Sequence, residues 1–133
     1  MKPFELAALP PERLVAIDGA IATDALSRFT VLHLGARERL VLDACVADLP
    51  DLADALAIDV GEAWSGWSLA GAGAEDLLVR GCALDIQRIA PGSATRTVMG
   101  GVTVLLRRTG AERWELRVDR SYAAWFGEFL RGL

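Results

Sequence analysis

Residues 67–85 constrain the fold of this 133-residue chain more than any other stretch. They begin as a short strand, bend through Gly71-Ala-Gly73 and continue with apolar residues at helical spacing. Glycine permits such a bend because it has no Cβ atom to obstruct the backbone. Glu75 and Asp76 fall in the first turn of the predicted helix, where the helix dipole favours negative charge. The stretch therefore predicts a strand, a tight bend and an amphipathic helix in that order.

The same periodicities predict an α+β fold, with two β-β-α-type halves forming an antiparallel sheet covered on one face by helices. Gly100-Gly101 predicts a hairpin turn, and Ser121 is a candidate N-cap for the last helix. Residues 1–12 are predicted to be irregular, and residues 20–28 to be a short helix or a loop. Helices are predicted at 49–58, 74–82 and 121–131, and strands at 14–17, 29–34, 39–46, 63–69, 94–99, 102–108 and from 113 onward.

Side-chain alternation assigns faces to the last predicted strand. Its inward residues are Trp114, Leu116 and Val118, and its outward residues are Arg113, Glu115 and Arg117. The strand pairs at 30–40 and 103–114 share a Gly-Ala turn followed by a Glu-Arg pair. This short match is compatible with a duplicated unit and equally with chance.

Length and composition predict a single domain over residues 1–133. The hydrophobic fraction of 53% is high enough to leave apolar surface for a partner. The net charge is −4 and no basic patch is evident, so nucleic acid and anionic membrane surfaces are not expected partners. There are two cysteines and no apolar run of about 18 residues, which favours a cytoplasmic protein without a membrane span.

No set of residues in the sequence predicts a catalytic, cofactor-binding or metal site. His33 is the only histidine, and it has no recognisable catalytic partner. Cys45 and Cys82 lack the spacing of a zinc site, and Cys82 falls on the apolar face of a predicted helix. The Gly-rich bend at 71–73 lacks phosphate-loop spacing and is followed by acidic residues, so it favours a strand-to-helix connection.

Four residues are predicted to contact a partner protein. Tryptophan and arginine are enriched at the energetic centres of interfaces. Trp64 and Trp67 lie three apart in one predicted strand and so point to opposite faces, and Arg96 and Arg120 flank strands. For Trp64, packing under the N-terminal segment is an equally weighted alternative. For both arginines, a surface or interface ion pair is the default.

The order of motifs after residue 58 resembles the gamma subunit of heterotetrameric sarcosine oxidase. The resemblance covers residues 59–133 well and 28–58 loosely, and the first half, 1–58, is shorter than is typical of that family. It is carried by Gly71-Ala-Gly-Ala74, Asp76-Leu-Leu78, Arg80-Gly-Cys-Ala-Leu-Asp85, Pro91-Gly-Ser93, Thr95-Arg-Thr97, Val104-Leu-Leu-Arg107 and Arg120-Ser-Tyr-Ala-Ala-Trp125.

The resemblance implies a fold similar to the folate-binding aminomethyltransferases. It also implies membership of a complex that oxidatively demethylates sarcosine or a related N-methyl amino acid in one-carbon metabolism. FAD, FMN, NAD and tetrahydrofolate are then expected in larger partner subunits, and this chain is expected to be an accessory subunit without a cofactor of its own.

Two alternatives remain open at this stage. One is a stand-alone folate-binding or one-carbon-transfer protein of the same fold, although Arg80-Gly-Cys-Ala83 does not match the Lys-Gly-Cys-Tyr-type folate motif of those relatives. The other is a homo-oligomer that uses the same apolar surface on itself.

Overall fold

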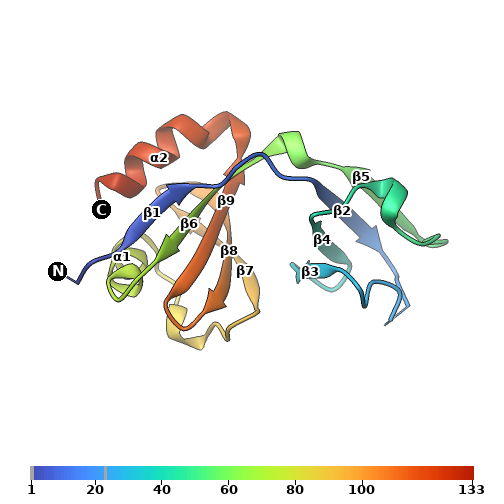
Figure 1. Cartoon of the computed structure of the whole chain (residues 1–133), viewed down its shortest axis with the longest axis horizontal. Coiled ribbons are helices and arrows are strands. Elements are labelled where there is room, and N and C mark those ends of the chain that lie inside the picture. The colour runs from blue at the N-terminus through green and yellow to red at the C-terminus, as the bar shows by residue number, and fades with distance from the viewer. Residues whose placement is uncertain (1, 23) are drawn as a thin grey trace. The chain divides into compact units, whose positions relative to one another are not determined.

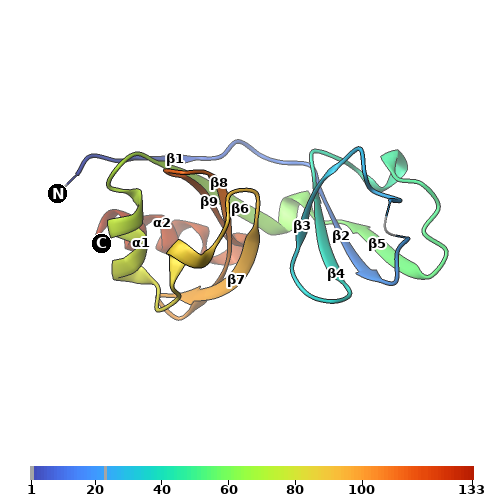
Figure 2. The same ribbon diagram turned by 90° about the horizontal axis from the view of Figure 1, so that it is seen from below.

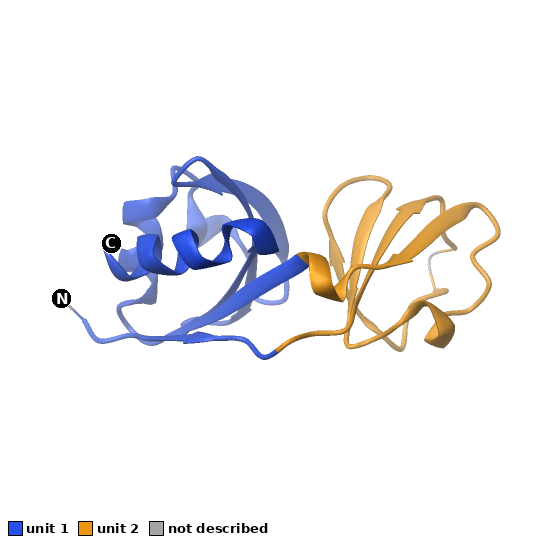
Figure 3. Cartoon of the chain, turned by 90° about the horizontal axis from the view of Figure 1, so that it is seen from above, with its two compact units in different colours: residues 1–10, 64–133 blue, residues 11–63 orange. Residues whose placement is uncertain are grey.

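The computed structural model of the chain describes residues 2–22 and 24–133, which form two compact units (Figure 3). Unit 1 comprises residues 1–10 and 64–133, and unit 2 comprises residues 11–63. Along the chain, unit 2 is inserted between the first strand of unit 1 and the remainder of unit 1. That residues 1–133 form a single domain stays a prediction.

Unit 1 is a five-stranded antiparallel sheet with two helices (Figures 1 and 2). The spatial order of its strands is β1-β6-β9-β8-β7, so β1 and β7 form the edges. The strands are β1 (Glu5–Ala8), β6 (Trp64–Ala70), β7 (Ala94–Met99), β8 (Val102–Gly110) and β9 (Arg113–Asp119). The helices are α1 (Ala74–Gly81) and α2 (Ala123–Arg131).

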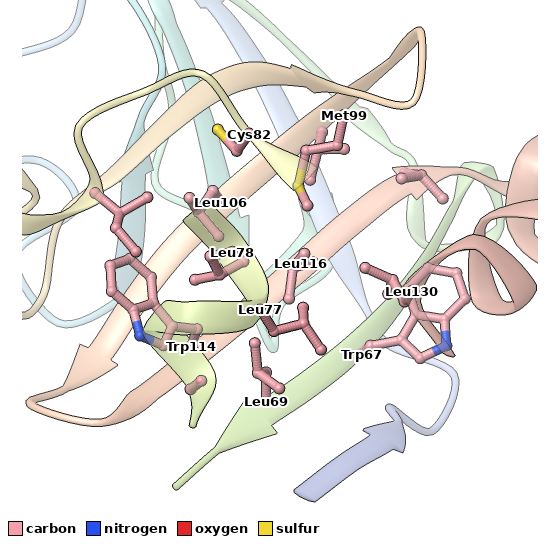
Figure 4. Close-up of a cluster of buried hydrophobic side chains, with 14 of the residues drawn as sticks. Trp67, Leu69, Leu77, Leu78, Cys82, Met99, Leu106, Trp114, Leu116 and Leu130 are labelled. Carbon is pink, nitrogen blue, oxygen red and sulfur yellow. The ribbon is translucent and has the colours of Figure 1, made fainter. Parts of the chain in front are cut away.

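The core of unit 1 lies between the sheet and its two helices (Figure 4). Alternation along each strand sends every second side chain toward the helices. Leu69 of β6, Leu106 of β8 and Leu116 of β9 meet Leu77 and Leu78 of α1 in this way. The predicted inward residues of β9 are thus confirmed, because Trp114, Leu116 and Val118 are all buried in this cluster.

Unit 2 is a four-stranded antiparallel sheet in the order β3-β4-β2-β5. Its strands are β2 (Leu14–Gly19), β3 (Thr30–His33), β4 (Glu38–Leu42) and β5 (Ala55–Asp59). Val15, Ile17 and Val41 anchor a small core on one face of this sheet. The two antiparallel sheets and few helices confirm the α+β class.

The predicted helix at 49–58 is wrong, because residues 55–59 form strand β5 and pair with β2. In this short segment the apolar residues also fit a period of two. Ala55 and Ala57 pack against the core, and Leu56 and Ile58 are exposed. Pairing with β2 supplies hydrogen-bond partners for the backbone of this segment. An isolated helix of the same length would be only marginally stable in water. The described residues of unit 2, 11–22 and 24–63, therefore contain no α-helix of the kind that a β-β-α half requires.

The N-terminal segment also differs from the prediction of an irregular lead. Glu5–Ala8 forms the edge strand β1, antiparallel to β6, with Leu6 opposite Leu69. Pro3 and Pro10 lie outside this strand, where a missing N–H costs no ladder hydrogen bond. The pairing partner is far away in sequence, so the local pattern alone did not reveal this strand.

Candidate interaction surface

The apolar face of α2 divides into a buried stripe and an exposed one. Phe126 and Leu130 are fully buried in the core of unit 1. Trp125, and Tyr122 in the turn that directly precedes the helix, each remain 50% exposed. A helix that packs on one sheet buries only the arc of its surface that faces the sheet. The apolar arc of this segment is wider than the buried arc. The result is an aromatic surface, formed by Tyr122, Trp125 and the partly buried Phe129, which we call the α2 aromatic patch.

Trp125 is fixed in place although half of it faces solvent. Its ring stacks on Phe129, with centroids 5.3 Å apart and an interplanar angle of 14°. Its far edge reaches the β7–β8 turn, where a Cβ atom at Gly100 would lie only 2.8 Å from Trp125 Cη2. An exposed aromatic side chain that is already ordered loses little conformational entropy on binding. Trp125 therefore has the properties of an interface anchor.

The Gly100-Gly101 turn gives a matched test of this packing. Both residues have positive φ, of 60° and 83°, which confirms the predicted hairpin turn. Gly101→Ala should cost about 1 kcal/mol of unfolding free energy from backbone strain alone, since nothing lies within 4 Å of its added methyl. Gly100→Ala should cost about 2–4 kcal/mol, because its methyl also collides with Trp125 and Phe129. Equal losses in urea denaturation would show that the rings do not rest on the turn.

The four predicted contact residues have different environments. Trp67 is buried and packs on Phe126, with ring centroids 5.4 Å apart, so in this structure it is a core residue. Trp64 is half-buried at the start of β6, opposite Asp119 at the end of β9. Arg120 follows β9 directly, so it lies with Trp64 at the end of the sheet where α2 begins. That these predicted residues contact a partner protein stays a prediction.

Arg96 lies in the edge strand β7 and is exposed. It is opposite Leu105, and alternation places it on the sheet face away from the helices. The α2 aromatic patch was not among the predicted contact residues. A helical projection of residues 122–133 would have shown that their apolar arc is too wide to be covered by packing on the sheet alone.

The sheet face away from the helices holds a compact charge cluster. Glu115 Oε1 accepts a hydrogen bond from Arg107 Nη1 at 3.0 Å and lies 2.9 Å from Arg117 Nη2. Side-chain alternation predicts that Glu115 and Arg117 face outward, but Arg117 is only 1% exposed. Gly66 explains part of this difference, since a Cβ atom there would lie 3.2 Å from Arg117 Cγ. The absence of a side chain at Gly66 leaves room for the Arg117 side chain.

Comparison with known proteins decides the family. The model of the sarcosine oxidase gamma subunit family matches residues 28–132. The chain belongs to the sarcosine oxidase gamma subunit family. No curated protein matches it.

Two solved structures have a similar fold. One is a chain of the heterotetrameric sarcosine oxidase from Corynebacterium sp. U-96, solved with pyrrole 2-carboxylate. The TM-score is 0.82 at 19% identity, over 96% of this chain and 81% of that one. The other is the glycine cleavage system aminomethyltransferase T from Bartonella henselae, with a TM-score of 0.69 at 17% identity. That match covers 97% of this chain and 45% of the aminomethyltransferase.

The start of α2 in this gamma-family chain is organised by Asp119 rather than by Ser121. The Asp119 carboxylate accepts hydrogen bonds from Ser121 Oγ at 2.6 Å and from Ser121 N at 2.9 Å. The predicted N-cap role of Ser121 is therefore wrong, because its hydroxyl donates to Asp119 instead of accepting from the helix. These two hydrogen bonds hold the pKa of Asp119 below its ordinary value, the side-chain bond having the larger effect.

Ser121→Ala should raise the pKa of Asp119 toward the ordinary value of an aspartate, because it removes the hydroxyl that donates to the carboxylate. A depressed folded-state pKa means that this carboxylate stabilises the fold fully above its ordinary pKa. The contribution is lost as the pH falls through the folded-state value. An NMR titration of the Asp119 carboxyl carbon would measure the shift, with Ser93→Ala in an exposed loop as a control that leaves it unchanged. A pKa unaffected by Ser121→Ala would contradict the assigned hydrogen bond.

The remaining candidates for chemistry are divided between the units: Cys82 belongs to unit 1, and Cys45 and His33 belong to unit 2. Cys82 is buried with its Sγ 3.2 Å from Thr97 Oγ1. Cys45 donates from its backbone N–H and its Sγ to Asp48, which lowers the pKa of that carboxyl. His33 is exposed and lines a groove of about 370 Å³ in unit 2 with Arg39.

Over residues 2–22 and 24–133, no three His, Cys, Asp or Glu side chains are grouped as a metal site would need. Nor does any helix in that part of the chain have the length and apolar character needed to cross a bilayer. In unit 1, a shallow groove of about 640 Å³ lies along the ends of β1, β6 and β9. It is lined in part by Phe4, Glu5, Glu112 and Arg113.

Proposed function

We propose that this chain is a non-catalytic accessory subunit of a sarcosine-oxidase-type complex. The observation that carries the proposal is the α2 aromatic patch, in which Trp125 is ordered by Phe129 and Gly100 and still half exposed. Such a surface resembles the centre of a protein interface, where Trp and Tyr contribute most of the binding energy. Membership of the gamma subunit family supports the same role.

In the proposed complex, larger subunits hold the flavins, NAD and tetrahydrofolate. They oxidise the N-methyl group of sarcosine or a related amino acid, releasing glycine from sarcosine. Oxygen is reduced to hydrogen peroxide, and the one-carbon unit leaves as formaldehyde or as methylene-tetrahydrofolate. This chain contributes surface and rigidity to the assembly. Its low cysteine content, two in 133 residues, is in keeping with a cytoplasmic complex.

Activity measurements on separated components test the non-catalytic role. The complex is isolated from its native cells through an affinity tag on this chain, and the tagged chain is also produced alone. We expect sarcosine-dependent peroxide formation and visible flavin absorbance in the complex, and neither in the lone chain. Dimethylglycine and other N-methyl amino acids, assayed in parallel, identify the preferred substrate. Turnover by the lone chain would overturn the proposal.

A folate-binding role is the second candidate, and the fold shared with aminomethyltransferase T favours it. The groove in unit 1 supplies an aromatic ring, Phe4, and two acids, Glu5 and Glu112. Tetrahydrofolate titration of the lone chain, followed by tryptophan fluorescence, separates the candidates. We expect no saturable change. A saturable change that Phe4→Ala abolishes would favour the folate-binding role.

A further inference from the structure

In the part of unit 2 that the structure describes, strand β5 is an open edge of the sheet. It pairs with β2 on one side, and it is the last strand in the order β3-β4-β2-β5. Its register with β2 is continuous from Ala55 to Asp59, and the strand contains no proline or lysine and no bulge. Prolines, lysines and bulges are the features that usually protect an edge strand, because an unprotected edge readily pairs with another chain. Strand β5 has none of them.

The hydrogen-bonding pattern identifies the backbone groups that face outward from this edge. Val60 N donates to Leu14 O at 2.9 Å, so Val60 and its alternate neighbours along β5 turn toward β2. Ala57 and Asp59 therefore direct their N–H and C=O groups away from the sheet. The N–H of Ala55 follows the same alternation and is used locally, donating to Leu52 O at 3.1 Å.

Both sides of the open edge are apolar. On one side, Ala57 lines a groove of about 300 Å³ together with Val46, Leu49 and Leu52. On the other side, Leu56 and Ile58 are 62% and 50% exposed. A strand added along β5 would direct its alternate side chains into the groove and onto Leu56 and Ile58. The edge thus offers both the backbone groups and the side-chain contacts that strand addition uses.

The charge around the edge indicates the chemistry of the added strand. No lysine, arginine or histidine occurs between residues 40 and 63. The same segment contains six acidic residues: Asp43, Asp48, Asp51, Asp54, Asp59 and Glu62. Asp43 and Asp48 form ion pairs with Arg13, and Asp59 accepts a hydrogen bond from Val46 N at 2.8 Å. Asp51, which lines the groove, and Asp54, which precedes β5, are exposed. A partner that carries Arg or Lys beside its apolar residues would complement this rim.

The same charges disfavour a second copy of this chain as the occupant. In an antiparallel pair of β5 strands centred on Ala57, Asp59 of each copy would be opposite Ala55 of the other. Asp54 of that copy directly precedes Ala55, so acidic residues of both copies would line the same edge. Bringing together two chains that each carry a net charge of −4 at such an edge is unfavourable.

From these observations, we infer that β5 accepts an extended, basic segment of a larger subunit as a fifth strand of the unit 2 sheet. The inference rests on the proposed function only in placing that segment in a companion chain. It adds a second contact, formed by main-chain hydrogen bonds, to the side-chain contacts of the α2 aromatic patch.

Amide hydrogen exchange and a matched pair of variants test the inference. The lone chain and the complex isolated through its tag are compared at Ala57 and Asp59. We expect fast exchange in the lone chain and slowing by more than about tenfold in the complex. Leu56→Lys combined with Ile58→Lys should weaken retention of the larger chains by about 10- to 100-fold. Val79→Lys, at a site 61% exposed on α1, should leave retention unchanged.

The outcomes separate this inference from the proposed function. If the larger chains bind while Ala57 and Asp59 exchange as fast as in the lone chain, strand addition is wrong and the accessory role stands. The same conclusion follows if the double lysine variant retains the larger chains fully. If the wild-type chain comes out of its native cells alone, both ideas fail. Concentration-dependent dimerisation with protection of Ala57 would assign the edge to a second copy and overturn the basic-segment inference.

Discussion

Phe126→Ala is expected to lower the free energy of unfolding by about 3–5 kcal/mol, the usual cost of removing a fully buried aromatic ring. Phe126 has no exposed surface and lies between Trp67 and Phe129, with ring centroids 5.4 and 5.7 Å away. Removing it would leave a cavity where α2 meets the sheet. Urea denaturation followed by far-UV circular dichroism measures the loss without depending on tryptophan fluorescence.

Trp125→Ala is the matched control for this prediction, since it removes the neighbouring aromatic residue from the half-exposed stripe. Its cost should stay below about 2 kcal/mol, because half of the ring is already in water. A Phe126→Ala cost as small as that of Trp125→Ala would contradict the assignment of α2 as part of the core of unit 1.

Trp125→Ala should, by contrast, weaken binding to the larger subunits by at least about 30-fold, the effect of losing an interface hot spot. Phe129 and Gly100 hold the Trp125 ring in place before binding, so the wild-type ring loses little conformational entropy when it binds. The variant therefore loses the full contact energy and saves almost no entropic cost. Trp125→Phe should keep most of the affinity. The measurement is a titration of the larger subunits with the purified chain by isothermal calorimetry.

Val79→Ala is the control for binding, because Val79 is also apolar and exposed and lies on α1. It should bind as the wild type does. Equal affinity of Trp125→Ala and the wild type would remove the α2 aromatic patch from the interface, even if the chain still assembles through another surface.

The sequence predicted the elements whose signals are local. The Gly100-Gly101 turn, α1 and α2 lie close to their predicted positions, because a glycine pair and a helical stripe can be recognised without knowing the rest of the fold. Residues 49–58 failed for the opposite reason. Their apolar residues fit a helix and a strand equally well, and the distant strand β2 decided between the two.

The candidate surface was predictable only in part. Alternation gave the correct face for Arg117, but it does not tell whether that face is covered, and Arg117 is buried. A helical stripe likewise does not tell which part of a wide apolar arc meets the sheet, so Trp125 was not distinguished from Phe126. The motif order did predict the family, which the match over residues 28–132 confirms.

Native mass spectrometry of material isolated from the native cells through a tag on this chain tests the central claim most directly. The wild-type chain should be recovered in an assembly with larger flavin-bearing chains, and sarcosine-dependent peroxide formation should accompany that assembly. Folded Trp125→Ala should be recovered mainly alone. A wild-type chain recovered only as a monomer or homo-oligomer, with the peroxide-forming activity in a separate fraction, would contradict the claim that it is a docked subunit.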